Sequence, residues 1–282
     1  MEFGLVIFPT DETISPIELV VAAETHGFEF LWFPEHSHIP ISRETPWGGV
    51  KGMPELPEEY KRTLDQFVKL AACASVGLRI KLGPGITLVA QRDPGWLAKE
   101  VASLDYLSGG GSCLESVMVG IVKCCASTGL LFRTDAQSCA RRSSSSRRFG
   151  PNRKQVFTAN TSILRRAGRG QNPFRSPPPS IMGAAAGPKN YADIVEFFDG
   201  WMPVGGLHDF EGCLLGLREA CVTARRDPDS LELTLFLSLG FEPANLSAYA
   251  KAGVKRIVLP LPSKSASIVL PLLVNYARYL PA

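Results

Sequence analysis

A glutamate and a histidine directly follow an apolar run of the chain, and they are the first candidates for chemistry. Residues 28–33 have the composition of a buried strand, and Glu35 and His36 come just after it. An imidazole changes its charge near neutral pH and can present either ring nitrogen to a cofactor or substrate. The alternative is a loop histidine bonded to a neighbouring backbone group. We predict that His36 and Glu35 are catalytic. The other histidines are expected to be structural or solvated: His26, His38 and His208.

Two turns rich in small residues are the next candidates. Residues 83–87 (GPGIT) end a third apolar run, and residues 184–188 (AAAGP) lead into a helix at Lys189. Small residues allow a ligand to approach the backbone, and unpaired N–H groups at a helix N-terminus attract phosphate. The same compositions also occur where a chain only turns or packs closely. Chemistry at these turns therefore depends on the elements around them.

The elements that would position these groups alternate between strand and helix. The first 110 residues predict strands at 3–8, 28–33 and 79–85, and helices at 17–26, 64–76 and 94–107. The last hundred predict strands at 180–183, 199–203, 231–237 and 256–260, and helices at 189–198, 208–226, 243–252 and 266–279. An eighth strand within residues 111–179 would complete a single α/β domain, a (β/α)8 TIM-type barrel over residues 1–282. In such a barrel the site lies at the C-terminal ends of the strands.

Residues 111–179 differ in composition from the rest of the chain. They hold ten Ser, ten Arg, two Lys and two acidic residues, whereas the other 213 residues carry 18 basic and 25 acidic groups. A Ser/Arg-rich segment is ordinarily a basic linker or a nucleic-acid-binding arm. The overall net charge of +3 therefore averages two unlike parts.

Outside that segment the chain is typical of a cytoplasmic globular protein with no nucleic-acid partner and no membrane span. No apolar run approaches the roughly 20 residues of a membrane helix, and the N-terminus has no basic leader region. The three Cys outside the segment have no paired or metal-like spacing: Cys73, Cys213 and Cys221. We therefore expect a reducing compartment and no bound metal.

Five phrases resemble the luciferase-like monooxygenase superfamily, and within it the F420-dependent oxidoreductases. They are LWFPEHSHIP (31–40), LVAQRDP (88–94), LDYLSGG (104–110), IMGAAAGP (181–188) and DGWMP (199–203). The resemblance covers residues 1–110 and 180–282. It implies the barrel fold and hydride transfer between reduced coenzyme F420, a deazaflavin, and a small organic substrate. It also implies a possible homodimer.

The resemblance also assigns roles to the candidate residues. It places His36 beside the deazaflavin ring, and a non-proline cis peptide at Gly85–Ile86, before Thr87, where a bulge supports the ring. It implies that the turn formed by Ala184, Ala185, Ala186 and Gly187 binds the cofactor phosphate. Trp47, in the long loop after His36, would cover the ring or would simply pack on the surface. These residues make up the predicted cofactor site.

The chain departs from the family pattern after Gly110. Members continue with a fourth strand of the type F-G-I-G-x-G-W-N-x-E, which carries an acid that could donate a proton, and this motif is missing here. One reading frame over, codons for residues 113–123 permit F-G-I-G-D-G-W-N-R, and residues 123–129 permit E-V-L-R-Q-H-G. The same frame permits H-G-E-Y at 156–161 and P-K-P-V-Q-K-P at 170–177. We infer that residues 111–179 are translated out of frame, between two compensating single-base changes.

The frameshift hypothesis affects the expected fold and activity, and other functions are possible alternatives. The fourth strand and the region after it should be lost or disordered, which would leave strand edges unpaired and the protein poorly soluble or inactive. The first alternative function is an FMN-dependent monooxygenase on the same fold. A second is a non-catalytic relic that binds cofactor without turnover. A nucleic-acid-binding protein that uses the Arg/Ser segment ranks last.

The frameshift is tested on the gene itself. We expect that one single-base change near codon 111 and a compensating change near codon 179 restore the motif G-W-N-x-E followed by Q-H-G. Sequencing the DNA decides this directly. If no single-base insertion or deletion restores that frame, residues 111–179 are a genuine basic segment.

Overall fold

A computed structural model of the chain describes residues 1–39, 55–76, 79–85, 87, 92, 94–108, 116–119, 180–183, 186–205, 209–238 and 246–281. Strands and helices alternate in these residues as the sequence predicts. The strands are β1 (Glu2–Val6), β2 (Phe30–Phe33), β3 (Lys81–Pro84), β4 (Ser116–Val119), β5 (Ser180–Gly183), β6 (Gly200–Trp201), β7 (Glu232–Phe236) and β8 (Val254–Pro260).

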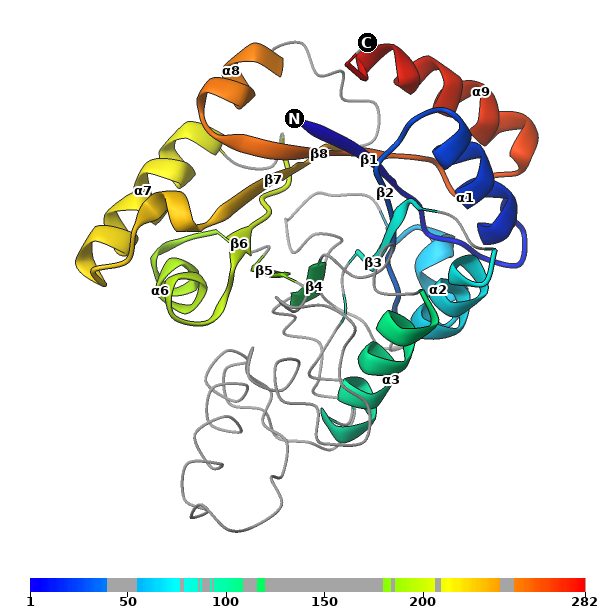
Figure 1. The fold of residues 1–282 in the computed structure, drawn as a ribbon, viewed down its shortest axis with the longest axis horizontal. Coiled ribbons are helices and arrows are strands. Elements are labelled where there is room, and N and C mark those ends of the chain that lie inside the picture. Colours follow the sequence, from blue (N-terminus) through cyan, green and yellow to red (C-terminus); the bar gives the residue numbers. More distant parts are fainter. Residues whose placement is uncertain are drawn as a thin grey trace.

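Seven α-helices are described, and they surround the curved sheet on its outer side (Figure 1). They are α1 (Pro16–Thr25), α2 (Gln66–Ala74), α3 (Pro94–Leu107), α6 (Pro188–Phe197), α7 (Phe210–Thr223), α8 (Leu246–Lys251) and α9 (Ala266–Tyr276). Three short 3₁₀ helices are also described: η2 (Glu58–Lys61), η6 (Pro228–Ser230) and η7 (Ala277–Tyr279). The sequence did not predict η2 or η6, whereas η7 is the last turn of the helix predicted at 266–279.

All the strand pairs are parallel, and the eight strands follow the order β3-β2-β1-β8-β7-β6-β5-β4. The first and last strands of the chain are therefore neighbours, with Phe3 opposite Ile257 and Leu5 opposite Leu259. Because parallel strands joined by helices all point the same way, their C-terminal ends lie at one edge. This confirms the predicted (β/α)8-type architecture.

The fourth strand corrects one expectation. We expected it to be lost, but Ser116–Val119 forms β4 and pairs in parallel register with β5, Val117 opposite Ile181. The physical reason is local, because Val117, Met118 and Val119 form a short apolar run that suits a strand covered on both faces. Among the described residues, the hydrogen-bonded order still ends at β3 on one side and β4 on the other. The region that follows β4 lies outside the described residues.

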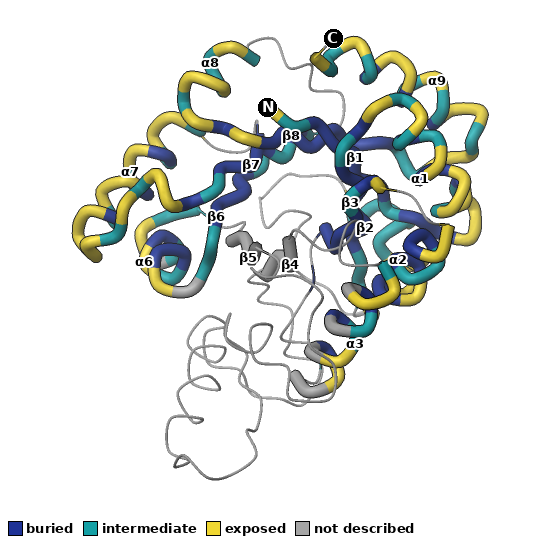
Figure 2. The backbone as a smooth tube through the Cα atoms, viewed as in Figure 1, coloured by how far each residue is buried: buried dark blue, intermediate teal, exposed yellow. Residues whose placement is uncertain are grey.

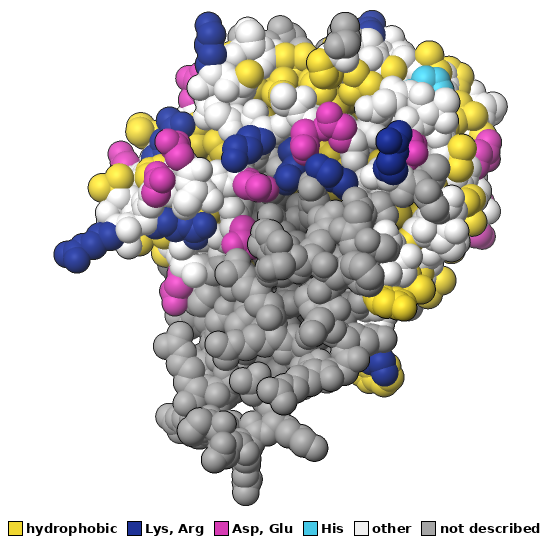
Figure 3. All heavy atoms as spheres, in the orientation of Figure 1, with side chains coloured by type: hydrophobic (Ala, Val, Ile, Leu, Met, Phe, Trp, Pro, Cys, Tyr) yellow, Lys and Arg dark blue, Asp and Glu magenta, His cyan; other side chains and the backbone are white. Residues whose placement is uncertain are grey.

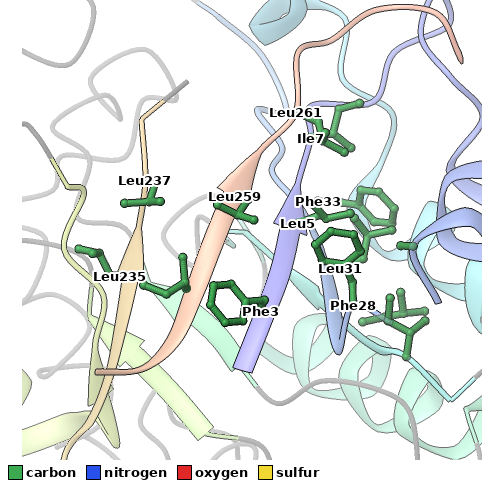
Figure 4. Close-up of a cluster of buried hydrophobic side chains, with 14 of the residues drawn as sticks. Phe3, Leu5, Ile7, Phe28, Leu31, Phe33, Leu235, Leu237, Leu259 and Leu261 are labelled. Atoms are coloured by element: carbon green, nitrogen blue, oxygen red, sulfur yellow. The ribbon is translucent and has the colours of Figure 1, made fainter. Parts of the chain in front are cut away.

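The strands β1, β2 and β8 divide their side chains between two cores, because successive residues point to opposite faces. Phe3, Leu5, Leu31 and Leu259 belong to the larger outer core beneath the helices, which Figure 4 shows in part. A small inner cluster lies on the other face of the sheet: Val6, Phe30, Trp32, Met202 and Val258. Figure 2 shows the same division, with buried strands inside and helices exposed along their outer sides.

Charged side chains near the starts of the strands form a linked group. Arg256 donates from Nε to Glu2 and from Nη1 to Glu232, both at 2.8 Å, and Lys81 lies 3.2 Å from Glu2. Burial opposes ionisation of Glu2, but hydrogen bonds from Arg256 and Lys81 prevail and lower the pKa of its carboxyl. Burial and the charge of Glu2 instead raise the pKa of Glu29. This group ties β1, β3, β7 and β8 together at the end opposite the expected site.

Helix ends follow signals in the sequence. Pro16 occupies the first turn of α1, and Gly27, with φ of +87°, follows its C-cap as the predicted stop. Asp65 caps α2 by accepting a hydrogen bond from the backbone N–H of Val68 at 2.9 Å. The predicted start of this helix at residue 64 is therefore two residues early. These caps fix where α2 begins, which matters for the site.

Several further expectations concern the whole chain. Within the described part, Cys73, Cys213 and Cys221 are free thiols, as the spacing predicted. No helix that the structure describes is long and apolar enough to cross a membrane. Acidic and basic side chains lie interspersed on the described surface in Figure 3, without a large area of one sign.

A substitution at Gly4 tests the inner cluster. A Cβ at Gly4 would lie 2.1 Å from Cδ2 of Phe30, so the buried ring must move. We expect Gly4→Ala to lower the free energy of unfolding by about 1–3 kcal/mol, the usual cost of overpacking a core. Urea denaturation measures this change.

Phe30→Leu supplies the matched control. Combined with Gly4→Ala, it should cost less than the two single changes added together, because the smaller side chain vacates the space. Strictly additive costs would contradict direct contact between these two residues.

Candidate active site at the C-terminal end of β2

Four consecutive residues at the end of β2 are held by the segment that begins α2. Gln66 Nε2 donates to the Phe33 carbonyl and Lys69 Nζ donates to the Pro34 carbonyl, both at 2.9 Å. The N–H of Gln66 donates to Glu35 Oε2 at 2.6 Å. Such bonds give backbone groups partners where the strand ladder ends. We call this set of contacts the β2 clamp.

His36 is the last residue of the clamp, and its backbone is bound twice by one hydroxyl. Thr63 Oγ1 accepts from the His36 N–H at 3.2 Å and donates to the His36 carbonyl at 3.1 Å. A hydroxyl has one donor and two acceptor positions, so it can serve both groups. The backbone from which the imidazole projects is therefore fixed.

The imidazole of His36 is half-buried and lies among aromatic rings. Its ring centroid is 5.0 Å from that of Tyr60 and 6.5 Å from that of Phe8, to which it is nearly parallel. Phe8 and Tyr60 also stack on each other, with centroids 4.4 Å apart. The ring thus lies where the C-terminal ends of β1 and β2 meet η2, partly accessible to a ligand. This is the predicted location of His36, and its catalytic role stays a prediction.

Glu35 takes part in an ion-pair network. Its Oε2 accepts from Arg92 Nη2 at 2.8 Å, and Arg92 also contacts Glu100 at 3.2 Å and Asp65 at 3.6 Å. The Glu35 side chain is only 11% exposed, and Arg92 lies 4.9 Å above the ring of Phe67. Glu35 Oε2 thus receives two donors, from Gln66 and Arg92, and holds the end of β2 against α2. Its predicted catalytic role stays a prediction.

Lys69 is an unusual residue for the buried face of α2. Its residue surface is 3% exposed, and Nζ donates to the carbonyls of Pro34 and Leu64, both at 2.9 Å. Burial lowers the pKa of Lys69 to about 8, and the negative charges of Glu35 and Asp65 oppose this shift only in part. Lys69 therefore holds the clamp at an electrostatic cost near neutral pH.

The end of β3 lies beside the clamp. The Gly85 N–H donates to the Phe33 carbonyl at 3.2 Å, and Thr87 Oγ1 donates to Gln66 Oε1 at 2.6 Å. A Cβ on Gly85 would lie 3.0 Å from Trp32 Cβ, so this position favours glycine for packing. Gly85 and Thr87 thus lie at the same edge of the sheet as His36.

Part of the predicted phosphate turn is also described. Gly187, with φ of +104°, is the N-cap of α6, and Pro188 occupies the first turn. Asn190 Nδ2 donates to the Ala186 carbonyl and tightens the turn. Because α6 follows β5, its N-terminus lies at the C-terminal edge of the sheet, where its partial positive charge attracts anions.

Four predicted site residues fall outside the described residues: Trp47, Ile86, Ala184 and Ala185. The proposed cis peptide at Gly85–Ile86 falls there too. Those predictions stand as made.

The other histidines behave as expected where they are described. His26 Nδ1 lies 2.8 Å from the Ala22 carbonyl within α1, and exposed His38 bonds Ser37. His208 lies outside the described residues.

Sequence reasoning missed the residues that build the clamp: Thr63, Gln66, Lys69 and Arg92. A usable signal was present, because Gln66 and Lys69 occur at helical spacing with Leu70 and Cys73 and share their buried face. A polar residue on the apolar face of a helix requires a buried partner. The partners themselves come from distant segments, so their identity was not visible in the sequence.

Metal binding finds no support in the described part of the chain, where no three His, Cys, Asp or Glu side chains cluster as ligands.

Comparisons with known proteins place this site in a family. The family model for luciferase-like monooxygenases matches residues 1–114. An uncharacterized protein of Mycobacterium tuberculosis is 30% identical over 280 residues, which cover 94% of each chain. The 5,10-methylenetetrahydromethanopterin reductase of Methanopyrus kandleri is 30% identical over 110 residues, 39% of this chain and 25% of that protein. The chain belongs to the luciferase-like monooxygenase family.

Solved structures share the fold at low identity. The coenzyme F420-dependent tetrahydromethanopterin reductase from Methanopyrus kandleri has a TM-score of 0.64 and 17% identity, covering 98% of this chain and 97% of its own. An F420-dependent secondary alcohol dehydrogenase in complex with an F420-acetone adduct has a TM-score of 0.66 and 13% identity, covering 99% and 98%. A riboflavin lyase with modified FMN has a TM-score of 0.57 and 16% identity, covering 89% and 65%.

The depressed pKa of Lys69 gives a pH test of the clamp. The unfolded chain binds more protons than the folded chain between about pH 8 and 10.5, so this residue makes stability rise with pH there. Below about pH 8 its contribution is unfavourable and constant. We expect the wild type to gain stability relative to Lys69→Met across this window, by at most about 1.4 kcal/mol per pH unit.

Urea unfolding at pH values from 7 to about 10.5 measures the difference between the two proteins. Lys61→Met, at an exposed residue paired with Glu58, is the control and should show no comparable slope. A difference between wild type and Lys69→Met that does not change with pH would rule out a buried cation at this position.

Proposed function

We propose that the chain is an F420-dependent oxidoreductase by descent and site, acting on a small organic substrate. The observation that carries the proposal is the β2 clamp, which presents the half-buried imidazole of His36 at the C-terminal edge of the barrel. Family membership and the partial match to a methylenetetrahydromethanopterin reductase support it.

The described residues fit a flat, phosphate-bearing cofactor. The His36 ring carries its two nitrogens among aromatic rings at the end of β2, and Gly187 caps the helix that follows β5. His36 would orient the ring or hold a proton beside it, and the turn at Ala186 and Gly187 would bind the phosphate. Reduced F420 supplies the hydride when it is bound. Trp47 would cover the ring and exclude water.

FMN is the alternative cofactor, because one structural relative holds a modified FMN. Proteins of this fold bind either flavin type. The cofactor therefore distinguishes two functions, an F420-dependent oxidoreductase and an FMN-dependent monooxygenase. We favour F420 because the partial sequence match is to a methylenetetrahydromethanopterin reductase, whose structural counterpart is F420-dependent.

We also propose that turnover by this copy is low or absent. The acid of the family motif G-W-N-x-E, a candidate proton donor, is missing from the chain, whatever the origin of residues 111–179. The protein would then bind its cofactor without efficient catalysis, as the relic hypothesis holds.

The free thiols of Cys73 and Cys221 agree with a reducing cytoplasm. A homodimer remains our expectation, and no nucleic-acid or membrane partner is proposed.

The experiment titrates the purified protein with F420 and with FMN, each followed by flavin fluorescence. We expect F420 to bind and FMN to bind more weakly. His36→Asn should weaken F420 binding, and it should slow any hydride transfer by about 10²–10⁴-fold, the range for the rate lost with a positioned acid or base. His38→Asn is the matched control, since His38 lies in the same segment but is exposed.

Restoring the predicted frame across residues 111–179 provides the second arm. The restored protein should gain F420-dependent turnover in one of two assays: small alcohols with oxidised F420 as the hydride acceptor, or unsaturated acceptors with reduced F420 as the hydride donor. Binding of FMN alone would favour the monooxygenase, and failure of both flavins to bind either protein would refute the proposal.

A further inference from the structure

Two buried polar side chains connect the ends of β2 and β3. Gln66 and Thr87 are each 1% exposed, although neither is an apolar residue. Gln66 Nε2 donates to the Phe33 carbonyl at 2.9 Å, and Gln66 Oε1 accepts from Thr87 Oγ1 at 2.6 Å. The amide of one side chain therefore bridges two strand ends with both of its functional atoms.

The bridge is supported by the backbone next to it. The Gly85 N–H donates to the same Phe33 carbonyl that receives the Gln66 amide, at 3.2 Å. A carbonyl oxygen has two lone pairs, so Phe33 accepts both bonds. On the helix side, the N–H of Gln66 donates to Glu35, which fixes the start of α2 to the same strand end. The first residue of α2 thus contacts both strand ends.

Because Gln66 and Thr87 are buried, losing either hydrogen bond would cost free energy of folding. A buried donor or acceptor that loses its partner retains the full cost of leaving water, which exceeds the net gain from making the bond. If Thr87 cannot donate, Gln66 Oε1 loses the hydroxyl donor that lies 2.6 Å away in a site with little access to water. Thr87 would then be released from α2.

We infer that Gln66 and Thr87 are positioning residues that fix the end of β3, at Gly85 and Thr87, against the β2 clamp. Thr87 was predicted to bind cofactor, but its hydroxyl proton is donated to Gln66. Its role is to hold the end of β3 in place. The effect of this arrangement on cofactor binding rests on the proposed function. The positioning of the end of β3 by Gln66 and Thr87 does not depend on the proposed function.

Thr87→Val tests the inference, because it removes the hydroxyl while nearly preserving the shape of the side chain. Hydrogen exchange measured by mass spectrometry on a peptide that contains Gly85 reports whether the end of β3 opens. We expect exchange there to accelerate about ten-fold or more, since a lost buried partner costs more than one factor of ten. Thr87→Ser should restore the wild-type rate.

Gln66→Met is the second variant, and it removes both bonds of the bridge while keeping an unbranched side chain. It should accelerate exchange at Gly85 at least as much as Thr87→Val. Thr25→Val is the matched control, because Thr25 also donates its hydroxyl, to the Val21 carbonyl, but lies exposed at the end of α1. The control should leave exchange at Gly85 unchanged.

Cofactor titration of the same variants separates the two claims. We expect Thr87→Val to weaken F420 binding about ten-fold in parallel with faster exchange, and Thr87→Ser to recover both. If the wild type binds neither F420 nor FMN, the proposed function fails while the exchange data still decide the inference. Unchanged exchange at Gly85 in both Thr87→Val and Gln66→Met would overturn it. So would weaker binding without faster exchange, which would make Thr87 a direct ligand.

Discussion

The parallel pairing of β1 with β8 is the interaction on which the rest of this structure depends. It joins the first and last strands of the chain, so the strands before and after residues 111–179 belong to one sheet. Because every pair in that sheet is parallel, the C-terminal ends of β1, β2, β3 and β5 share one edge. The candidate site exists only because this pairing brings those ends together.

The two ends of the strands have different roles: residues at the N-terminal ends stabilise the sheet, and residues at the C-terminal ends form the candidate site. At the strand starts, Arg256 links Glu2 and Glu232, and these charges hold strands from both halves of the chain. At the other end, α2 binds the backbone at the end of β2 and the side chain of Thr87 beyond β3. A barrel can vary its site while keeping its frame because the two ends are physically independent.

The β2 clamp shows how a polar site is built on an apolar barrel. Gln66 and Lys69 occupy buried positions where leucine would contribute more hydrophobic stabilisation, and burial depresses the pKa of Lys69. In return, the carbonyls of Phe33 and Pro34 have donors and His36 has a fixed backbone. Function at such sites commonly comes at the expense of stability.

The sequence by itself determined the alternation of strands and helices, the (β/α)8-type fold and the location of His36, because these follow from local apolar patterns and short phrases. It also showed that residues 111–179 differ from the rest of the chain in their content of Ser, Arg and acidic residues. It did not reveal that Ser116–Val119 pairs with β5, or that Glu35 is bound by Arg92, 57 positions away along the chain. Nor did it reveal that Gln66 bridges Phe33 and Thr87. Only the tertiary structure decided these, because a buried polar group needs a partner, and folding rather than sequence distance selects which partner comes within reach.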